Sequence, residues 1–519
     1  MTLPLMVAPA NNKTEEALAA EKKIFRQLQE HFAGAYETFY PNRLAPKTIV
    51  VIPSLTLDQE ILCKIDGIVL YEERLLCLLL LLRMPRTHIV YVTSTPIDPV
   101  IIDYYLHLLP GITGHHARER LHLLSCYDGS PISLTQKILA RPRLVRRIKQ
   151  AIPEGHIAHL SCFNVTAYER KLAVALQIPI YGCDPDLFFW GTKSGSREIF
   201  RECGMDMPPG YENLKNEEEV IQALVKLKLE HPELNKAVVK MNDGFSGEGN
   251  AVFSYDGLTS DGLEQIIPKQ ISSRMEVVAR DLSYPLFMKK FEQMGGIVEA
   301  FLEAEETASP SVQCRINPSG KIDVISTHDQ LIGGKYGQVF LGATFPASKD
   351  YNREIGRLGG LVAAALKEKG VLGRFGVDFI SVLKQGQWTH NAIEINLRKG
   401  GTTHPYIMLQ FLTDGDYDAQ KGSYLTAAGE ERYYLASDNL QDEHFRGLTP
   451  QDLMEIVILH GLHFSGTKEE GVMFHLIGAL SQYGKLGLVC IGDSHERARF
   501  FYDETVKVLK GETEFQTNG

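Results

Sequence analysis

The chain has 519 residues and a formal net charge of -10, with 44% hydrophobic and 23% charged residues. This length exceeds what one hydrophobic core supports and predicts three or four globular domains. The negative charge argues against a surface that coats nucleic acid, and the longest apolar run, LLCLLLLL at 75–82, is too short to span a membrane. The eight cysteines stand singly, which favours reduced thiols, and the N-terminus lacks a secretory pattern, so we expect a cytoplasmic protein.

Strand-like and helix-like segments alternate through the first 188 residues, after an amphipathic helix predicted over 14–32. Such alternation is typical of an open α/β sheet. The basic stretch 133–152 is interpreted as a solvated helical face, with a phosphate or partner patch as the alternative. The predicted strands are the apolar, largely β-branched runs at 48–55, 88–96, 121–127, 156–163 and 178–182.

A glycine-rich loop, GFSGEG at 244–249, lies between predicted strands at 237–241 and 250–255, after two predicted helices within 191–231. Glycine is costly to order, so such a loop indicates either a tight hairpin or a close approach to a ligand such as phosphate. A Walker loop would continue into Lys-Ser/Thr and a helix, and a dinucleotide fingerprint also needs a helix. A strand follows here, so the pattern predicts a hairpin that lies over a ligand.

Oxygen-bearing side chains gather on two further predicted strands, 377–382 and 391–398, which a hairpin joins. Asp378 lies on the first strand, and Glu394 and Asn396 stand two apart on the second, so these last two share a face. Arg398 continues the same face. Hard oxygen ligands suit Mg²⁺, although an exposed polar strand face is the alternative for the triplet alone.

In this order, Lys193, Lys240 with GFSGEG, Glu299 in GIVEAFLE, Asp378 and EINLR resemble the ATP-grasp superfamily over roughly 185–415. The whole layout, with 326–346 and 471–494, is similar to the pre-ATP-grasp peptide ligases of the pheganomycin type. The resemblance implies a multidomain α/β and α+β fold. Its parts are an N-terminal open α/β (pre-ATP-grasp) domain at 1–188, ATP-grasp subdomains at 189–300 and 301–415, and a small C-terminal α+β domain at 416–519.

The same resemblance implies where ATP and the metal bind. Asp378, Glu394 and Asn396 fall at the positions for Mg²⁺, or for Mn²⁺ in its place. A solvated helix lysine is the alternative for Lys193, and an exposed strand-end acid is the alternative for Glu299. The residues implied to hold the nucleotide are Lys193, Lys240, Gly244, Ser246, Gly247, Gly249, Val298, Glu299, Phe301 and Glu306.

The catalytic residues implied are Arg398, Arg315 and His328. Ligases of the D-alanine type carry an arginine two residues before the metal aspartate, where this chain has Gly376, so Arg315 or Arg398 takes that role. His328, in a stretch at 326–340 expected to be a loop, would relay a proton from the amine. A histidine paired with a neighbour is the alternative, and His404 is a second candidate for the wall of the site.

The resemblance implies an ATP-dependent carboxylate–amine ligase that forms a peptide-type bond through an acyl phosphate and releases ADP and phosphate. Its partners would be a small-molecule acid, such as an amino acid or peptide, and an amine, with neither nucleic acid nor membrane. A homodimer is expected only from the general frequency of dimers. A small-molecule kinase and a non-catalytic nucleotide-binding protein are the two other classes.

Overall fold

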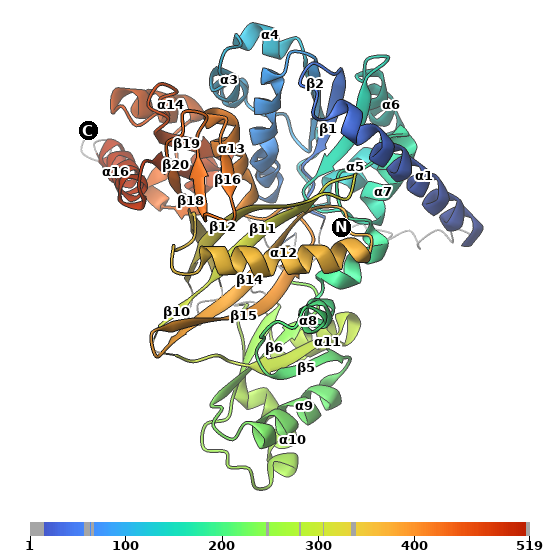
Figure 1. Ribbon diagram of the computed structural model, residues 1–519, viewed down its shortest axis with the longest axis vertical. Coiled ribbons are helices and arrows are strands. Elements are labelled where there is room, and N and C mark those ends of the chain that lie inside the picture. The colour runs from blue at the N-terminus through green and yellow to red at the C-terminus, as the bar shows by residue number, and fades with distance from the viewer. Residues whose placement is uncertain are drawn as a thin grey trace, which may run out of the picture.

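The computed structural model describes residues 15–56, 63, 67–244, 249–279, 282–304, 306–333 and 339–514, and it contains three large sheets (Figure 1). The first is a four-stranded parallel sheet of order β3-β2-β1-β4, which confirms the predicted open α/β sheet. The run at 178–182 contributes only a bridge from Ile180 to Leu160. The strands are β1 (Lys47–Ile52), β2 (Thr87–Thr93), β3 (Leu121–Ser125) and β4 (Ile157–Cys162).

Helices flank this sheet on both faces. The predicted N-terminal helix is α1 (Glu15–Phe39), and the basic stretch forms two helices because Pro142 starts a new one. The leucine run lies in the 3₁₀ helix η1 (Ile68–Arg83), whose leucines pack in one core with the C-terminal part of the chain. The other helices are α3 (Pro99–His107), α4 (Gly114–Arg118), α5 (Leu134–Leu139), α6 (Pro142–Gln150), α7 (Ala167–Leu176) and η2 (Pro185–Gly191).

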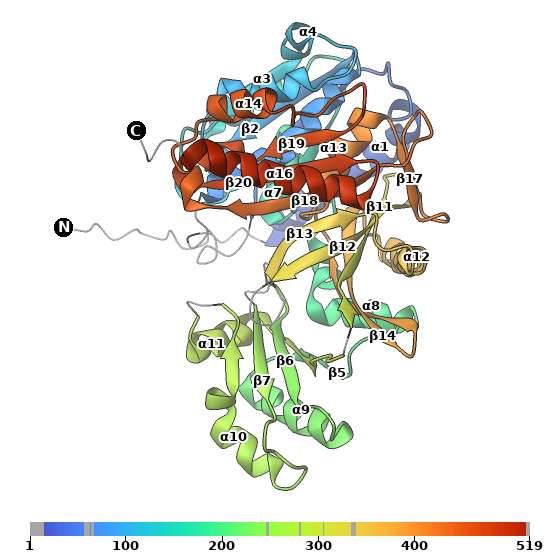
Figure 2. The ribbon, with the colours of Figure 1, turned by 90° about the vertical axis from the view of Figure 1, so that its left-hand side faces the viewer.

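The second sheet has five strands in the order β5-β9-β6-β7-β8 and forms the lower lobe in Figure 2. The predicted hairpin is present, because β6 and β7 pair antiparallel. Helices α9 (Glu217–Glu230), α10 (Leu263–Arg274) and α11 (Tyr284–Met294) bury one core against it, and α8 (Lys193–Glu202) precedes it. The strands are β5 (Gly210–Leu214), β6 (Lys236–Met241), β7 (Asn250–Ser254), β8 (Met275–Val277) and β9 (Gly296–Ala300).

The third sheet has nine strands and fills the centre of the molecule. Its path runs β10-β14-β11-β12-β13-β18-β20-β19, and β15 pairs with β14. Helix α12 (Asn352–Glu368) packs on the face that presents Val312 and Val377. The strands are β10 (Thr307–Ala308), β11 (Pro310–Ile316), β12 (Ile322–Gly333), β13 (Val339–Phe345), β14 (Gly373–Lys384), β15 (Gln387–Asn396), β18 (Tyr433–Gln441), β19 (Gly471–His475) and β20 (Lys485–Gly492).

The C-terminal part differs from the separate unit that the sequence suggested. Thr449 caps the helix that begins at Pro450, and two strands and a helix follow it, but β18 pairs with β13 and so continues the central sheet. Pairing removes the open strand edge that a separate unit would leave. The remaining elements are α13 (Thr403–Thr413), β16 (Asp416–Asp418), β17 (Ser423–Leu425), η3 (Glu443–Phe445), α14 (Pro450–Leu459), η4 (Ile477–Ala479), α15 (Leu480–Tyr483) and α16 (His495–Glu514).

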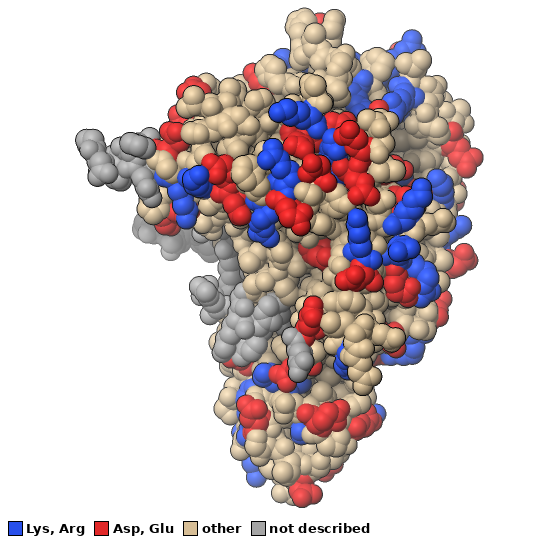
Figure 3. Space-filling model, turned by 60° about the vertical axis from the view of Figure 1, so that its left-hand side comes forward, with Lys and Arg blue, Asp and Glu red and all other residues tan. Residues whose placement is uncertain are grey.

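The surface carries both signs of charge. Acidic and basic side chains are interspersed over the face in Figure 3. Of the helices that the structure describes, none is both long and apolar enough to cross a membrane. All eight cysteines are free thiols, and Cys63 is the exposed one among them.

Candidate active site

The centre of the candidate site is the hairpin of β14 and β15, which the sequence predicted. Gln385 and Gly386 both have positive φ, 51° and 77°, as a two-residue hairpin turn of the primed type requires. The resulting register places Asp378 opposite Glu394. Asn396 Nδ2 donates to Asp378 Oδ2 and to Glu394 Oε1, both at 2.9 Å. The three predicted metal ligands therefore lie in direct contact on one face of the sheet.

Cations surround this carboxylate pair. Burial and the Glu394 carboxylate raise the pKa of Asp378. Burial would also raise the pKa of Glu394, but the bonded ammonium of Lys193 lowers it instead. Burial lowers the pKa of Arg398, and the charges of Glu394 and Asp378 oppose that shift, so the guanidinium lies within electrostatic range of the pair. The site thus holds two acids that need positive charge and two cations that supply part of it.

The donor set fits a hard divalent cation. Within the described part of the chain, no group of three or more histidine, cysteine or carboxylate side chains is placed to hold a metal. The set here is two carboxylates and one amide, with Gln330 Nε2 donating to Asp378 Oδ1 at 2.9 Å. Mg²⁺ is bound in proteins through one or two carboxylates while substrate phosphates and water complete its sphere. These residues match that requirement.

Lys193 stands at the start of α8, and the hairpin loop fixes its position. Thr192 caps the helix by accepting from Gly195 N at 3.0 Å. Asn242, just after β6, accepts from Lys193 N through its carbonyl at 3.2 Å and from Ser194 N through Oδ1 at 3.0 Å. The Lys193 side chain is 12% exposed and bonds Glu394, so the alternative of a solvated lysine is wrong. The sequence reasoning did not single out Asn242, since its partners are distant in the chain.

Lys240 and Glu299 form the second charged centre, on neighbouring strands β6 and β9. Lys240 Nζ lies 2.5 Å from Glu299 Oε1, and Arg197 Nη1 lies 3.2 Å from Glu299 Oε2. All three side chains are buried, so the alternative of an exposed acid for Glu299 is wrong. Arg197 also bonds Glu212 and the carbonyl oxygens of Pro208 and Gly210.

The sequence analysis missed Arg197, although a signal was present. It stands four residues after Lys193 on the same helix, so both side chains lie on one face of α8. Its partner Glu299 is 102 residues away in sequence, which no local pattern reveals. Arg197 thus joins the helix of Lys193 to the strand beside Lys240.

The other residues predicted to hold nucleotide are spread more widely. A Cβ added to Gly244 would lie 3.3 Å from the Gly249 Cα, so the two arms of the hairpin loop approach closely. Ser246 and Gly247 lie outside the described residues, as do Glu248, Lys335 and Gln338.

Three further residues of this set lie on or after β9. The side chain of Val298 is fully buried in the core on the α9 side of the sheet, and not on the face of Glu299. Lys236 Nζ lies 5.5 Å from the centre of the Phe301 ring. Glu306 is exposed, and its carbonyl accepts from Leu383 N at 3.1 Å.

The structure separates the predicted catalytic residues. Arg315 lies on β11 four residues beyond Ser311, the strand partner of Asp378, which amounts to about 13 Å along the strand. Its Nη2 donates to Asp323 Oδ2 at 2.6 Å. Of these two arginines, Arg398 is the one on which the charges of Glu394 and Asp378 act.

His328 is not part of a reactive loop. Residues 326–333 belong to β12, and His328 is fully buried, with Nε2 2.7 Å from Tyr434 Oη. Burial lowers its pKa to about 3, so the ring stays neutral. A proton relay by His328 is therefore a wrong prediction, because the apolar core disfavours the charged form. His404 is likewise buried, and its Nε2 lies 2.9 Å from His475 Nε2.

Comparison with known proteins is consistent with this geometry. Residues 187–265 and 261–420 match the family described as IQCH-like, ATP-grasp, and 452–505 match the PGM1 C-terminal domain. L-propargylglycine–L-glutamate ligase of Streptantibioticus cattleyicolor is 31% identical over 450 residues, which cover 85% of this chain and 89% of that protein.

Two solved structures share the fold at low identity. Biotin carboxylase from Campylobacter jejuni, in a β,γ-ATP complex, superposes with a TM-score of 0.53 at 13% identity, over 91% of this chain and 96% of that one. N5-carboxyaminoimidazole ribonucleotide synthetase in its ADP complex gives 0.52 at 14% identity, over 91% and 98%. At these identities the likeness concerns the fold alone.

Proposed function

The chain belongs to the ATP-grasp superfamily, and on that premise we propose that it is an ATP-dependent carboxylate–amine ligase that works through an acyl phosphate. The observation that carries the proposal is the pair Asp378 and Glu394, bridged by Asn396 and flanked by Lys193 and Arg398. A nucleoside triphosphate carries negative charge that Lys193 and Arg398 would neutralise. The relative named as a ligase of two amino acids supports an amine and an acid of that size as substrates.

The geometry supports a role for each of these residues. Asp378, Glu394 and Asn396 would hold Mg²⁺, or Mn²⁺, which neutralises phosphate charge when bound. Lys193 and Lys240 would bind the phosphates, and the close arms of the hairpin at Gly244 and Gly249 would let backbone N–H groups reach them. Arg398 would stabilise the charge that moves as a substrate carboxylate attacks the γ-phosphate.

The second half of the reaction needs no group from the protein to become covalently attached. An amine attacks the acyl carbon, phosphate leaves, and an amide remains, with ADP released as the other product. Exclusion of water is essential, because the acyl phosphate would otherwise hydrolyse. We also propose a homodimer, because dimers are the commonest oligomers of soluble proteins, and the molar mass from light scattering would test it.

ADP release tests the proposal. The protein is incubated with Mg²⁺-ATP, a pool of amino acids and short peptides, and hydroxylamine, which traps an acyl phosphate as a hydroxamate. We expect ADP and hydroxamate together, and a loss of both by roughly a hundred- to a thousandfold in Asp378→Ala and Glu394→Ala. Glu354→Ala, which removes an exposed acid of α12, is the matched control and should change neither product.

The products separate the classes of function. ADP with a phosphorylated small molecule and no hydroxamate would identify a kinase and overturn the ligase. Hydroxamate formation that survives both alanine variants would show that the carboxylate pair is not the reaction centre.

A further inference from the structure

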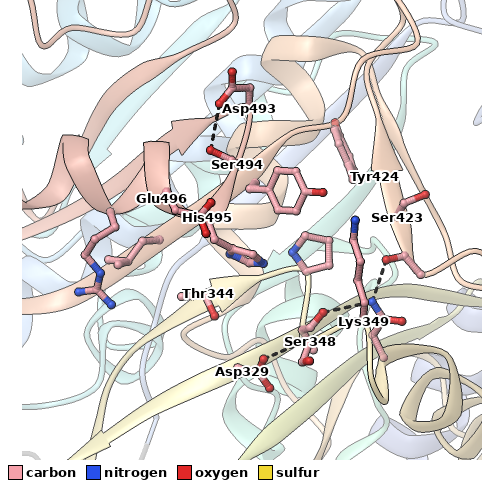
Figure 4. Close-up of a pocket in the computed structure, with 17 residues that line it drawn as sticks. Asp329, Thr344, Ser348, Lys349, Ser423, Tyr424, Asp493, Ser494, His495 and Glu496 are labelled. Atoms are coloured by element: carbon pink, nitrogen blue, oxygen red, sulfur yellow. Dashed lines mark hydrogen bonds between the residues drawn. The ribbon is translucent and has the colours of Figure 1, made fainter.

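A cavity of about 510 Å³ lies between the central sheet and the C-terminal helix. Side chains from four distant segments converge on it (Figure 4): β12 and β13 with the turn before α12, the segment of β17, the start of β18, and the start of α16. Its size is in the range of small-molecule sites, which run from roughly 300 to 1,000 Å³. None of the residues predicted to bind nucleotide or metal lines it.

The cavity lies on the opposite face of the sheet from Asp378 and Glu394. Gln330 donates to Asp378, so it points to the carboxylate face. Its neighbour Asp329 on β12 lines the cavity and must point the other way, since side chains alternate along a strand. Helix α12 packs on that second face. An occupant of the cavity therefore cannot reach an acyl phosphate formed at the carboxylates.

Charges of both signs line the cavity on different walls. The α12 side presents Lys349, whose Nζ lies 3.9 Å from Glu431 Oε2 and whose side chain is largely exposed. The α16 side presents the acids Asp493 and Glu496, with Arg499 one turn further along that helix. A ligand with one positive and one negative end can meet both walls, whereas a plain anion would meet the two acids.

Neutral polar groups and aromatic rings fill the space between these walls. The His495 ring lies against Tyr433, with centroids 4.8 Å apart, and burial lowers its pKa, so it contributes a neutral ring. Asp329 is already bonded to Ser348 N at 2.8 Å and to Tyr351 Oη at 2.7 Å. It therefore holds the turn that carries Lys349 in place, and it serves as a positioning residue.

We propose that this cavity is a second small-molecule site that binds a free α-amino acid as a zwitterion. The ligand carboxylate faces Lys349 and the ligand ammonium faces Asp493 and Glu496. The bound amino acid is not consumed, because the sheet separates it from the carboxylate pair. The proposal needs no assumption about the reaction that the protein catalyses.

Calorimetric titration tests this site without nucleotide. Each of the twenty standard amino acids is titrated into the full chain, and at least one is expected to bind with a stoichiometry of one. Lys349→Glu and Glu496→Lys each reverse one end of the charge pattern and should weaken binding about tenfold. Arg353→Glu, which reverses an exposed charge on α12 outside the cavity, should leave binding unchanged.

Blocked ligands give an independent readout. The N-acetyl derivative and the amide of the same amino acid each lose one charge and should each bind about tenfold more weakly. Both protein variants change exposed side chains, so their thermal midpoints should equal that of the wild type. The proposal is overturned if no amino acid binds at up to about 10 mM. It is also overturned if binding survives Lys349→Glu and is removed by Arg398→Gln, which would place the ligand at the carboxylate pair.

Discussion

Glu299 and Glu394 each hold a lysine that is expected to bind nucleotide, but their surroundings differ. Glu299 bonds Lys240 and Arg197, and its side chain is 3% exposed. Glu394 bonds Lys193, is 22% exposed and faces a second carboxylate, Asp378. The first acid is bonded by two cations, whereas the second has one bonded cation and shares its site with another carboxylate. A buried pair is satisfied when both charges are matched, so Glu299 is a structural acid and Glu394 is available to a cation.

Arg197→Met should produce the largest loss of stability, because it removes one of the two cations bonded to the buried Glu299. Glu299 would keep one cation instead of two, and the carbonyl oxygens of Pro208 and Gly210 would lose their donor. Removing one partner of a buried ion pair costs roughly 3–5 kcal/mol. The free energy of unfolding, measured by urea titration, should fall by about that amount.

Arg201→Met is the matched control for this change. Arg201 bonds the same Glu212 from one turn further along α8, but its side chain is 54% exposed. Exposed ion pairs contribute about 0–1 kcal/mol. Equal losses of stability in the two variants would show that the buried pair of Arg197 and Glu299 contributes no more than the exposed pair of Arg201 and Glu212.

Glu72 in η1, which packs beside the N-terminal sheet, extends the comparison to an acid held by hydrogen bonds from Ser94. Ser94 N and Ser94 Oγ each donate to its carboxylate at 2.6 Å, and burial raises its pKa to about 7. The native state therefore keeps the proton between pH 4.5 and 7, while the unfolded chain loses it. The free energy of unfolding should fall as pH rises through this range, by up to roughly 3 kcal/mol.

Glu72→Gln should remove the share of that fall due to Glu72 and leave the share of its neighbour Glu73, whose pKa burial also raises to about 7. The variant therefore gains stability relative to the wild type from pH 4.5 to 7. Thermal midpoints measured across this range give the comparison. The exposed Glu119→Gln should follow the wild type at every pH. A parallel pH profile for Glu72→Gln and wild type would show that Glu72 ionises normally in the folded protein.

The local part of this architecture is readable in the sequence. Alternation and a two-residue turn predicted the β14–β15 hairpin, and with it the contact of Asp378, Glu394 and Asn396. The remaining features depend on contacts between distant segments. The burial of His328 needs Tyr434 from a strand 106 residues away, and β18 joins the central sheet through β13. Such pairings leave no periodic signal in one segment, so propensity and spacing do not reveal them.

Arg398→Gln and Arg315→Gln together test which arginine stabilises transferring charge at Asp378 and Glu394. The charges of both carboxylates act on Arg398, whereas Arg315 bonds Asp323 further along the sheet. Loss of a group that stabilises transferring charge costs about a hundredfold in rate, near 2.7 kcal/mol. We expect that loss in hydroxamate formation for Arg398→Gln, with Arg315→Gln within about threefold of wild type. The reverse order would assign the role to Arg315.

Lys193→Met and Lys240→Met compare the two centres directly through their response to Mg²⁺, which is the smallest effect expected here. In chelator, Lys193→Met leaves the Asp378–Glu394 pair short of a bonded cation, and about 1 kcal/mol of stability should be lost. Added Mg²⁺ should restore it, because a divalent cation at the carboxylates replaces the missing charge. Lys240→Met leaves the carboxylate pair intact and Arg197 on Glu299, so Mg²⁺ should stabilise it by no more than it stabilises the wild type. Thermal midpoints with and without Mg²⁺ decide the matter: an equal response in both variants would mean that Glu394 is no more available to a cation than Glu299.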